Sequence, residues 1–345
     1  MFDFCCPRCK GPLEASPEHY RCRACGETYP VVLGIPDFRV FPDPYIGYAD
    51  DRAKGSRVVA GMDRASFAEL VRRYWELTPD VPRHLVDSYV SHVLGAAVRA
   101  QSTLADARAA GIRLGAREAA SHGPLLEVGC GTGGLLIAAA RDYEQVVGVD
   151  IAFRWLVIAA RRVAEAVVTG ELTAEQAARI QLVCACAESL PLPDAGFDVV
   201  IGANVLEHAS RQADLLAQSH RALRPRGLLF LTTVNRLSLA PEPHVKVWGV
   251  GLLPRRWMSP FVQRVRGVPY RHIRLRSMLG LVAGVRAAGF QDWEVRPARV
   301  ADVDLGRYSP VIRAGARAYE HIRGLPGGRQ VLGLFGPLLQ VAAVA

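Results

Sequence analysis

The sequence predicts a doubly wound α/β sheet with a small metal-binding ribbon at its N-terminal end. Two observations predict the sheet. A short apolar run, Leu125–Val128, is broken by glycines, and an Ala-rich helical segment and a second apolar run ending on Asp150 follow it. Strand-like and helix-like segments then alternate as far as Arg296. Two Cys-x-x-Cys pairs near the N-terminus predict the ribbon.

The glycines after Leu125–Val128 indicate a nucleotide-type ligand. A Cβ atom at Gly129 or Gly131 would hold a ligand away from the backbone, and the free N–H groups of the next helix favour a negative group. Asp150 can accept hydrogen bonds from both hydroxyls of a ribose. The spacing of Gly129, Gly131 and Gly134 also fits dinucleotide-binding dehydrogenases, so the glycines by themselves leave both ligand classes open.

Three ordered segments separate these classes. They are Glu127-Val128-Gly129-Cys130-Gly131-Thr132-Gly133, then AESLPLPDAGFDVVIGANVLEHA at 187–209, then RALRPRGLLFLTTVN at 221–235. Together they resemble the successive motifs of class I S-adenosylmethionine-dependent methyltransferases. The resemblance implies a Rossmann-like methyltransferase domain over residues 123–345, with S-adenosyl-L-methionine as its cofactor.

The same resemblance assigns parts of the cofactor to parts of the chain. Glu127 and the glycines hold the amino-acid end, Asp150 takes the ribose, Ile151 packs on the adenine, and the segment from Asn204 lies near the methionine part. The cofactor-binding residues implied in this way are Glu127, Gly129, Cys130, Gly131, Gly133, Asp150, Ile151, Cys186, Ala187, Glu188, Asn204 and Val205.

One position departs from the family pattern. Relatives commonly carry an aspartate that accepts from the adenine amine, and this chain has Cys186 there. A thiol is a weak hydrogen-bond acceptor. Either the backbone of Ala187 and the side chain of Glu188 replace it, or packing holds the adenine. We expect a lower cofactor affinity as a result.

The composition and net charge bear on the cellular compartment of the protein and on the kind of partner it could bind. The formal net charge of +9 and the isoelectric point near 9.4 suit an acidic partner such as nucleic acid, anionic lipid or a phosphorylated substrate. The start, MFDFCCPRCK, has no apolar signal core, and no stretch reaches the roughly 18 apolar residues of a membrane span. These features predict a cytoplasmic protein without a transmembrane segment.

Four cysteines predict a structural zinc site in residues 1–38. Cys6 and Cys9 form one Cys-x-x-Cys pair, Cys22 and Cys25 form the second, and Cys5 is interpreted as a neighbour. A reducing cytosol disfavours disulfides, and a redox pair would need a thioredoxin-like context that is absent. The segment resembles Trm112-like zinc ribbons, which accompany some methyltransferases. We expect the ribbon to be independent of cofactor binding.

Two further regions precede the main domain. Residues 39–62 are rich in Pro, Gly and charge, which predicts a linker. Residues 63–122 predict helices, the first capped by Asp63, followed by helices over 84–94 and 96–110. In the family such helices cover the cofactor cleft, so the linker region and these helices could close over substrate. The alternative is that they only extend the core.

The main domain continues the alternation of strands and helices. The predicted helices cover 152–168, 215–223 and 278–288, and the predicted strands cover 180–184, 199–203, 227–233 and 292–296. The last apolar run, 337–344, predicts the antiparallel strand that the family inserts near its C-terminus. The alternative is an amphipathic tail that touches a membrane.

The pair Glu207-His208 lies in a segment that resembles ubiquinone O-methyltransferases. In those enzymes an acid three residues upstream of the glutamate helps to ligate a metal, and this chain has Asn204 there. Two ligands without the third make a poor cation site, so we expect no metal at this place. A structural hydrogen bond is the simpler interpretation of His208, which we keep as a third candidate for a catalytic base.

Residues 236–277 form an insertion after a predicted strand end, where α/β sheets bind ligands. The insertion is therefore expected to build the acceptor pocket. His244, shortly after Asn235, is the first candidate for a general base, and His272 is the second. From Pro241 onward the only acid is Glu242, and aromatic residues alternate with the cations Lys246, Arg255, Arg256, Arg264, Arg266, Arg271, Arg274 and Arg276.

Three function classes follow. The first is methyl transfer to an oxygen or carbon nucleophile of a small biosynthetic intermediate, with an anionic or lipid-linked compound as an option. The second is methylation of an RNA base, with the ribbon and the basic insertion gripping RNA. Against RNA, the segment after the fourth strand reads Asn204-Val205-Leu206-Glu207 in place of an N/D-P-P-[FY] loop. The third is a cofactor-binding scaffold whose ribbon recruits a partner.

Overall fold

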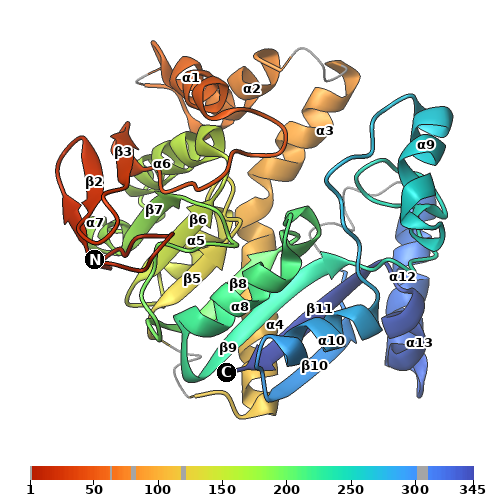
Figure 1. Ribbon diagram of the computed structural model, residues 1–345. Coiled ribbons are helices and arrows are strands. Elements are labelled where there is room, and N and C mark those ends of the chain that lie inside the picture. Colours follow the sequence, from red (N-terminus) through yellow and green to blue (C-terminus); the bar gives the residue numbers. More distant parts are fainter. Residues whose placement is uncertain (1, 63, 79–82, 118–121, 301–309) are drawn as a thin grey trace.

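A seven-stranded mixed sheet forms the centre of the molecule, with strand order β10-β11-β9-β8-β5-β6-β7 (Figure 1). The computed structural model describes residues 2–62, 64–78, 83–117, 122–300 and 310–345. The strands from β5 to β9 pair in parallel, which confirms the predicted α/β sheet. Their bounds are β5 Leu125–Val128, β6 Val146–Asp150, β7 Ile180–Cys184, β8 Phe197–Ala203, β9 Leu223–Val234, β10 Asp292–Pro297 and β11 Leu338–Val344.

The final apolar run is a strand inside the sheet. β11 lies between β9 and β10 and pairs antiparallel with both, as Figure 1 shows. Its side chains Leu339, Val341 and Ala343 are fully buried. The predicted C-terminal strand is confirmed, and the membrane-touching tail is excluded because these apolar residues already pack in the core.

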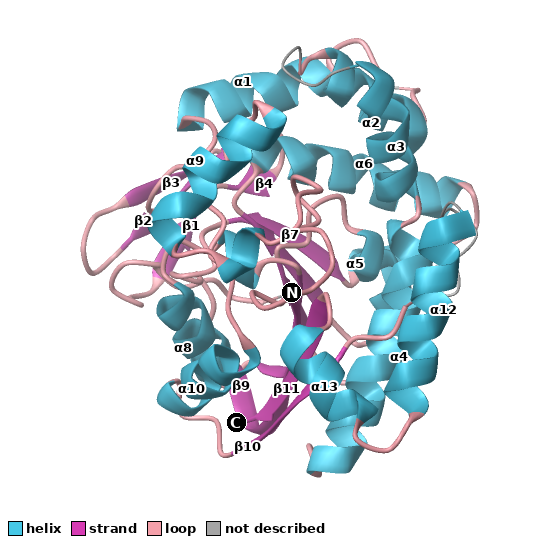
Figure 2. Ribbon diagram, turned by 90° about the vertical axis from the view of Figure 1, so that its right-hand side faces the viewer, coloured by secondary structure: helices cyan, strands magenta, loops and turns pink. Residues whose placement is uncertain are grey.

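Helices cover both faces of the sheet, and alternate residues of each strand serve the two cores. Leu125 faces a core built with α4 (Ala96–Leu114), α5 (Gly134–Ala139) and α6 (Phe153–Val168). Leu126 faces a core built with α8 (Gln212–Ala222) and α10 (Met278–Ala287). Figure 2 shows α4 and the pair α8 and α10 on opposite sides of the sheet. Because both faces of the sheet are covered, the neighbouring residues Leu125 and Leu126 of β5 are both apolar although they point to opposite faces.

The N-terminal segment forms a four-stranded ribbon that packs directly on the sheet domain. Its strands are β1 Leu13–Ala15, β2 His19–Cys22, β3 Thr28–Val32 and β4 Ile35–Pro36. Cys5 N–H donates to the carbonyl of Pro191 (3.0 Å), and the carbonyl of Cys184 accepts from Phe38 N–H (2.7 Å). Phe38 is completely buried in the same core as Val183 and Leu215.

The interpretation of residues 39–62 as a linker was wrong. Residues Tyr48–Val59 form helix α1, which packs against α6. Asp51 is fully buried, and Lys54 is 9% exposed. Several of the charges that made the segment look solvated are instead in ion pairs: Arg39 with Asp51, Arg52 with Asp37, and Asp43 and Asp51 with Arg154.

The helices expected in 63–122 are present. α2 covers Phe67–Glu76, α3 covers Arg83–Leu94, and α4 extends four residues beyond the predicted Ala110. Ser66 caps α2 in a capping box with Glu69. The predicted cap Asp63 lies outside the described residues.

Besides α1, four α-helices of the described residues have no counterpart in the sequence prediction: α7 Ala174–Ala178, α9 Arg255–Arg266, α12 Pro310–Gly324 and α13 Gly328–Phe335. Pro260 inside α9 and the glycines before and within α13 argue against helix at the sequence level. Packing against the rest of the molecule overrides these local preferences.

Candidate cofactor and acceptor site

The glycine turn after β5 is shaped by close contacts that only glycine permits. Gly129 has φ +76°, and a Cβ atom there would lie 2.7 Å from Cγ2 of Val205. Gly131 has φ +50°, and its N–H donates to Oδ2 of Asp150 (2.8 Å). The other oxygen of Asp150 accepts from Ala152 N–H (2.7 Å). The carboxylate at the end of β6 therefore fixes the turn after β5.

Glu127 presents an unpaired buried charge beside this turn. Its side chain is 5% exposed, and Oε2 has no hydrogen-bond partner among the described residues. Burial raises the pKa of Glu127 well above its usual value, and nearby Asp150 adds to the rise. An unsatisfied buried carboxylate is costly unless a ligand provides a donor. The chemistry of this position fits the ammonium group of an amino acid.

Two cavities meet at the glycine turn. One, of about 340 Å³, lies between the turn and the side chains Ala96, Arg99 and Thr103 of α4. The other, of about 320 Å³, runs along β6 toward His208. The lining residues common to both are Gly129, Gly131, Trp155 and Asn204. One elongated ligand can therefore occupy both spaces.

Ten of the twelve predicted cofactor residues line these cavities: Glu127, Gly129, Cys130, Gly131, Asp150, Ile151, Ala187, Glu188, Asn204 and Val205. Gly133 instead caps the N-terminus of α5 with φ +73°. Oε1 of Glu188 accepts from the N–H (2.8 Å) and the hydroxyl (2.9 Å) of Ser210. That carboxylate oxygen is already occupied, which reduces its capacity to accept from an adenine amine.

Cys186 does not reach either cavity. Its side chain is fully buried, and its thiol donates to the carbonyl of Phe41 (3.4 Å). The expected adenine contact at this position is therefore replaced by a contact within the protein. The neighbouring segment from Phe41 to Tyr45 lines the second cavity instead. The sequence prediction allowed for closure of the linker region over substrate, but it named none of these residues as lining the site.

Buried ion pairs hold the Phe41–Tyr45 segment in place. Arg39 donates to Oδ2 of Asp51 (2.6 Å) and to the carbonyl of Ile151 (3.1 Å). Arg154 donates to Oδ1 of Asp51 (2.7 Å) and to Oδ2 of Asp43 (3.0 Å). The side chains of Arg39 and Asp51 are completely buried. No sequence pattern signals this network, since its partners are up to 112 residues apart.

Two candidate bases lie next to each other at the far end of the second cavity. His208 lines that cavity, and its Nε2 lies 3.2 Å from Nε2 of His244. Nδ1 of His244 is 2.5 Å from Oε1 of buried Glu242. The insertion therefore brings His244 against His208 and orients it with a carboxylate. The sequence prediction noted Glu242 as the only acid of residues 241–277 but assigned it no role beside His244.

The two imidazoles have opposite electrostatic surroundings. Burial, followed by the charge of His244, lowers the pKa of His208 to about 4. Burial also opposes the charge on His244, but the hydrogen bond and the charge of Glu242 outweigh it and raise the pKa of His244. His208 is therefore neutral at neutral pH, whereas His244 holds a proton more readily.

A third group converges on the same point. The ligand atoms of Glu207, His208 and His244 lie within 4.8 Å of one another. Glu207 is fully buried, its Oε2 accepts from Thr233, and its Oε1 has no partner among the described residues. The insertion thus supplies a third ligand that the expectation of a poor cation site did not foresee. The donor set could hold a divalent cation.

The remaining candidate base is elsewhere. His272 is exposed, has φ +62°, and its ring packs edge-on against Tyr45 with centroids 5.2 Å apart. It lines neither cavity. The structure gives His272 no place beside the other two histidines.

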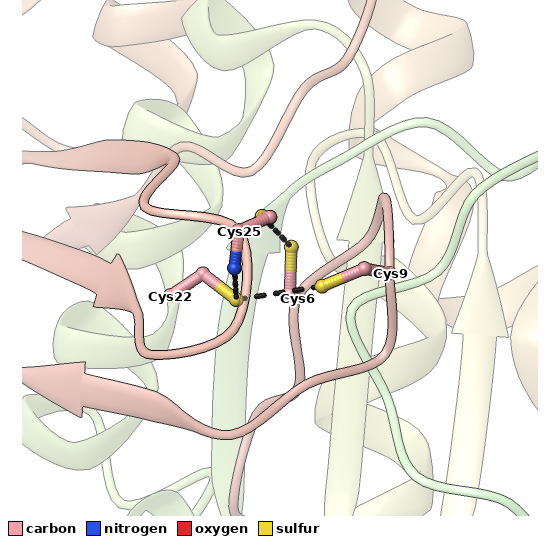
Figure 3. Close-up of side chains that lie close together, drawn as sticks. All are labelled: Cys6, Cys9, Cys22 and Cys25. Atoms are coloured by element: carbon pink, nitrogen blue, oxygen red, sulfur yellow. Dashed lines mark hydrogen bonds between the residues drawn. The ribbon is translucent and has the colours of Figure 1, made fainter.

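The four cysteines of the ribbon converge, as Figure 3 shows. Sγ of Cys6 lies 3.7 Å from Sγ of Cys25, and Sγ of Cys9 lies 3.5 Å from Sγ of Cys22. Disulfide sulfurs would be about 2.05 Å apart. Tetrahedral thiolates at about 2.3 Å from zinc would be about 3.8 Å apart. Cys5 is outside this group, and its thiol contacts the carbonyl of Leu192.

Comparison with known proteins agrees with the site. Residues 126–231 match the model of a family described as "Methyltransferase domain". A "Probable S-adenosylmethionine-dependent methyltransferase" of Mycobacterium tuberculosis is 34% identical over 125 residues, covering 34% of this chain and 38% of that protein. A ubiquinone biosynthesis O-methyltransferase of Idiomarina loihiensis is 32% identical over 156 residues, covering 45% of this chain and 57% of that protein.

Among solved structures, an S-adenosylmethionine-dependent methyltransferase of Mesorhizobium loti aligns with a TM-score of 0.44 and 19% identity, over 64% of this chain and 90% of that one. The chain spans about 38% to 57% of the two curated relatives named above. The family match covers β5 through most of β9, the part of the sheet that carries the glycine turn. Residues 126–231 therefore match a methyltransferase-domain family, and the similar curated proteins carry names of S-adenosylmethionine-dependent or ubiquinone biosynthesis methyltransferases.

Proposed function

We propose that this protein transfers a methyl group from S-adenosylmethionine to an oxygen or carbon nucleophile of a small biosynthetic intermediate. The observation that carries the proposal is the pair of cavities joined at the glycine turn. One ligand can occupy the junction while space remains beside His208 for an acceptor. The names of the ubiquinone O-methyltransferase relatives favour a small molecule.

The unpaired carboxylate of Glu127 would receive the amino group of the cofactor, and Asp150 would receive the ribose hydroxyls. Ile151 and the Phe41–Tyr45 segment would enclose the adenine, since both line the second cavity. The bound cofactor supplies an activated methyl group on a sulfonium. The protein must therefore position the nucleophile in line and exclude water.

An acceptor hydroxyl would also need a base. His208 is neutral and lines the cavity, so its imidazole can take the proton. His244 lies against it, and Glu242 favours positive charge on the pair. In this arrangement His208 contacts the acceptor, His244 orients His208, and the carboxylate of Glu242 stabilises the positive charge that the pair gains.

We further propose that Cys6, Cys9, Cys22 and Cys25 hold a structural Zn²⁺. The support is the convergence of four thiols at spacings close to those of a tetrahedral site. The metal would stabilise a short segment whose own apolar content is small. Elemental analysis of purified protein should find about one zinc per chain.

The cofactor assignment is tested with Asp150→Ala. The variant should weaken binding of S-adenosylhomocysteine about tenfold or more, because the ribose loses a charged acceptor and the glycine turn loses the hydrogen bond at Gly131. Calorimetry measures both proteins. Unchanged affinity, or a preference of the wild-type protein for NADH, would contradict the assignment.

The acceptor class is tested separately. Protein, cell extract and methyl-labelled cofactor are combined, and the label is followed into RNA and into small molecules. Label in small molecules is expected. Label in RNA would favour the alternative in which the exposed arginines of α9 grip RNA, and no transfer despite cofactor binding would favour a scaffold role.

A further inference from the structure

The outer side of the insertion exposes large apolar side chains. Trp257, Phe261 and Val265 recur at four-residue spacing on α9 and form one stripe, with exposed fractions of 59%, 36% and 53%. Trp248, Leu252 and Val268 flank the helix and are also exposed. We call these six residues the α9 surface. Such a concentration of exposed apolar residues marks an interaction site.

The α9 surface is held by a small core of its own. Met258 and Val262, on the adjacent face of α9, are buried together with Val247, Val250 and Tyr270. Figure 1 shows α9 at the edge of the molecule, away from the central sheet. α9 therefore has one apolar face that is already packed and, beside it, an apolar stripe that is exposed.

Cations border the stripe. At about 100° per residue, Arg256 and Arg264 lie on one side of it and Arg255 and Arg266 on the other, beyond the buried face. Among the described residues, no salt bridge joins these four arginines to a carboxylate. The only acid of residues 241–277 is Glu242, which is 4% exposed and bonded to His244. The stripe is thus bordered by cations on one side, at Arg256 and Arg264. Arg255 and Arg266 lie beyond the buried face and donate to the carbonyls of Leu275 and Val245.

We propose that the α9 surface docks the protein on the surface of an anionic membrane. Tryptophan and phenylalanine side chains partition into the boundary between headgroups and acyl chains, and arginines beside them pair with lipid phosphates. The proposed contact is with the membrane surface. No described helix is long and apolar enough to cross a membrane. The docking is independent of the proposed methyl transfer.

Charge alone would also suit RNA, but the apolar members distinguish the two partners. Bases stack on aromatic rings, whereas Leu252, Val265 and Val268 offer no stacking face. Aliphatic and aromatic side chains together gain from insertion into lipid. The same insertion carries His244 beside the second cavity, so docking would bring the acceptor site close to a membrane-dissolved compound. This last consequence rests on the proposed function.

Vesicle binding tests the proposal without cofactor or acceptor. The full chain is mixed with vesicles of phosphatidylcholine containing about 30% phosphatidylglycerol, and the bound fraction is measured by sedimentation. We expect binding that falls about tenfold or more on pure phosphatidylcholine and also falls at high salt. Tryptophan emission should shift to shorter wavelength on binding, because Trp248 and Trp257 leave water.

A matched pair of double variants identifies the surface. Trp257→Ser with Phe261→Ser should reduce vesicle binding about tenfold or more. Ile112→Ser with Val168→Ser removes two side chains that are 74% and 87% exposed on α4 and α6, and it should leave binding within about twofold. Circular dichroism and thermal melting confirm that each variant is folded.

Three results would overturn the proposal. They are failure of the folded wild-type protein to bind anionic vesicles, equal loss of binding in both double variants, and no loss in the Trp257 and Phe261 variant. Binding of single-stranded RNA at physiological salt, without binding to vesicles, would assign the arginines to RNA. Cofactor affinity is measured alongside, so failure of docking is distinguishable from failure of the methyltransferase assignment.

Discussion

At the scale of single residues, the site depends on carboxylates whose surroundings differ. Asp150 accepts two backbone hydrogen bonds, Glu242 is bonded to His244, and one oxygen of Glu127 has no partner among the described residues. Burial raises the pKa of both Glu127 and Asp150. A carboxylate left unpaired in the free protein is available to a cationic group of a ligand, at a cost in stability.

Glu127→Gln should therefore separate binding from stability. The amide keeps the shape and removes the charge, so affinity for S-adenosylhomocysteine should fall about tenfold or more. Because the folded-state pKa of Glu127 is raised, the wild-type protein loses stability as pH rises above the usual value of 4.5, and the variant does not. Its melting temperature should equal or exceed that of the wild type at pH 7. A lower melting temperature at pH 7 would contradict this reasoning.

A second residue-scale prediction concerns Glu242→Gln. Glu242 holds the pKa of His244 above its usual value, so the variant should lower that pKa and move proton uptake by the pair to lower pH. The stability that this interaction contributes is present below about pH 6.5 and is lost as pH rises through the folded-state pKa. Imidazole resonances followed by NMR titration measure the shift. Titration curves that do not differ between the variant and the wild type would show that Glu242 only packs.

At the scale of elements, the segment before α1 forms a wall of the second cavity, and α1 supplies Asp51 to the ion pairs that hold this wall. Composition predicted a linker here, because prolines, glycines and charges are typical of exposed chain. Two of these charged residues, Arg39 and Asp51, instead form buried ion pairs with each other and, through Asp51, with Arg154. These pairs fix the Phe41–Tyr45 wall of the second cavity, which is why a local pattern could not reveal it.

Asp51→Asn should destabilise the protein by about 3–5 kcal/mol, because it leaves Arg39 and Arg154 buried with one counter-charge fewer. Well below its melting temperature, it should also weaken S-adenosylhomocysteine binding, since the wall of the cavity loosens. Glu171→Gln breaks the exposed pair with Arg141 and should cost less than about 1 kcal/mol with no change in affinity. Chemical denaturation and calorimetry report the two quantities, and equal effects of both variants would count against the ion-pair network.

At the scale of the whole molecule, the ribbon is joined to the sheet. Cys5, Lys10 and Phe38 donate hydrogen bonds to carbonyls in the segment 184–191, and Phe38 packs in the core of the sheet domain. The chain then continues directly into the wall of the cofactor cavity. This arrangement changes the expectation that the ribbon and the cofactor site are independent.

Removal of zinc should consequently weaken cofactor binding. Cys22→Ser, or treatment with a strong chelator, should release the metal and raise the dissociation constant for S-adenosylhomocysteine several-fold, because the ribbon no longer anchors the segment that follows it. Cys5→Ser, outside the thiol cluster, serves as the control and should keep both zinc and affinity. Zinc loss without any change in affinity would show that the ion pairs hold the wall by themselves.

The sequence by itself determined the strands from β5 to β9, the glycine turn and the acid at the end of β6. These elements could be predicted because they depend on local periodicity and on backbone conformations that glycine adopts far more readily than other residues. The final strand and the cluster of four cysteines could also be predicted, because an apolar run and two Cys-x-x-Cys pairs are local sequence patterns.

Only the tertiary structure decided which side chains meet. His244 reaches His208 across 36 residues, Glu207 joins them from a buried turn, and Arg39 contacts Ile151 across 112 residues. Such pairings depend on how elements pack, and no spacing along the chain encodes them. The same reason explains why Cys186 faces Phe41 and why the charged segment before α1 became a wall of the site.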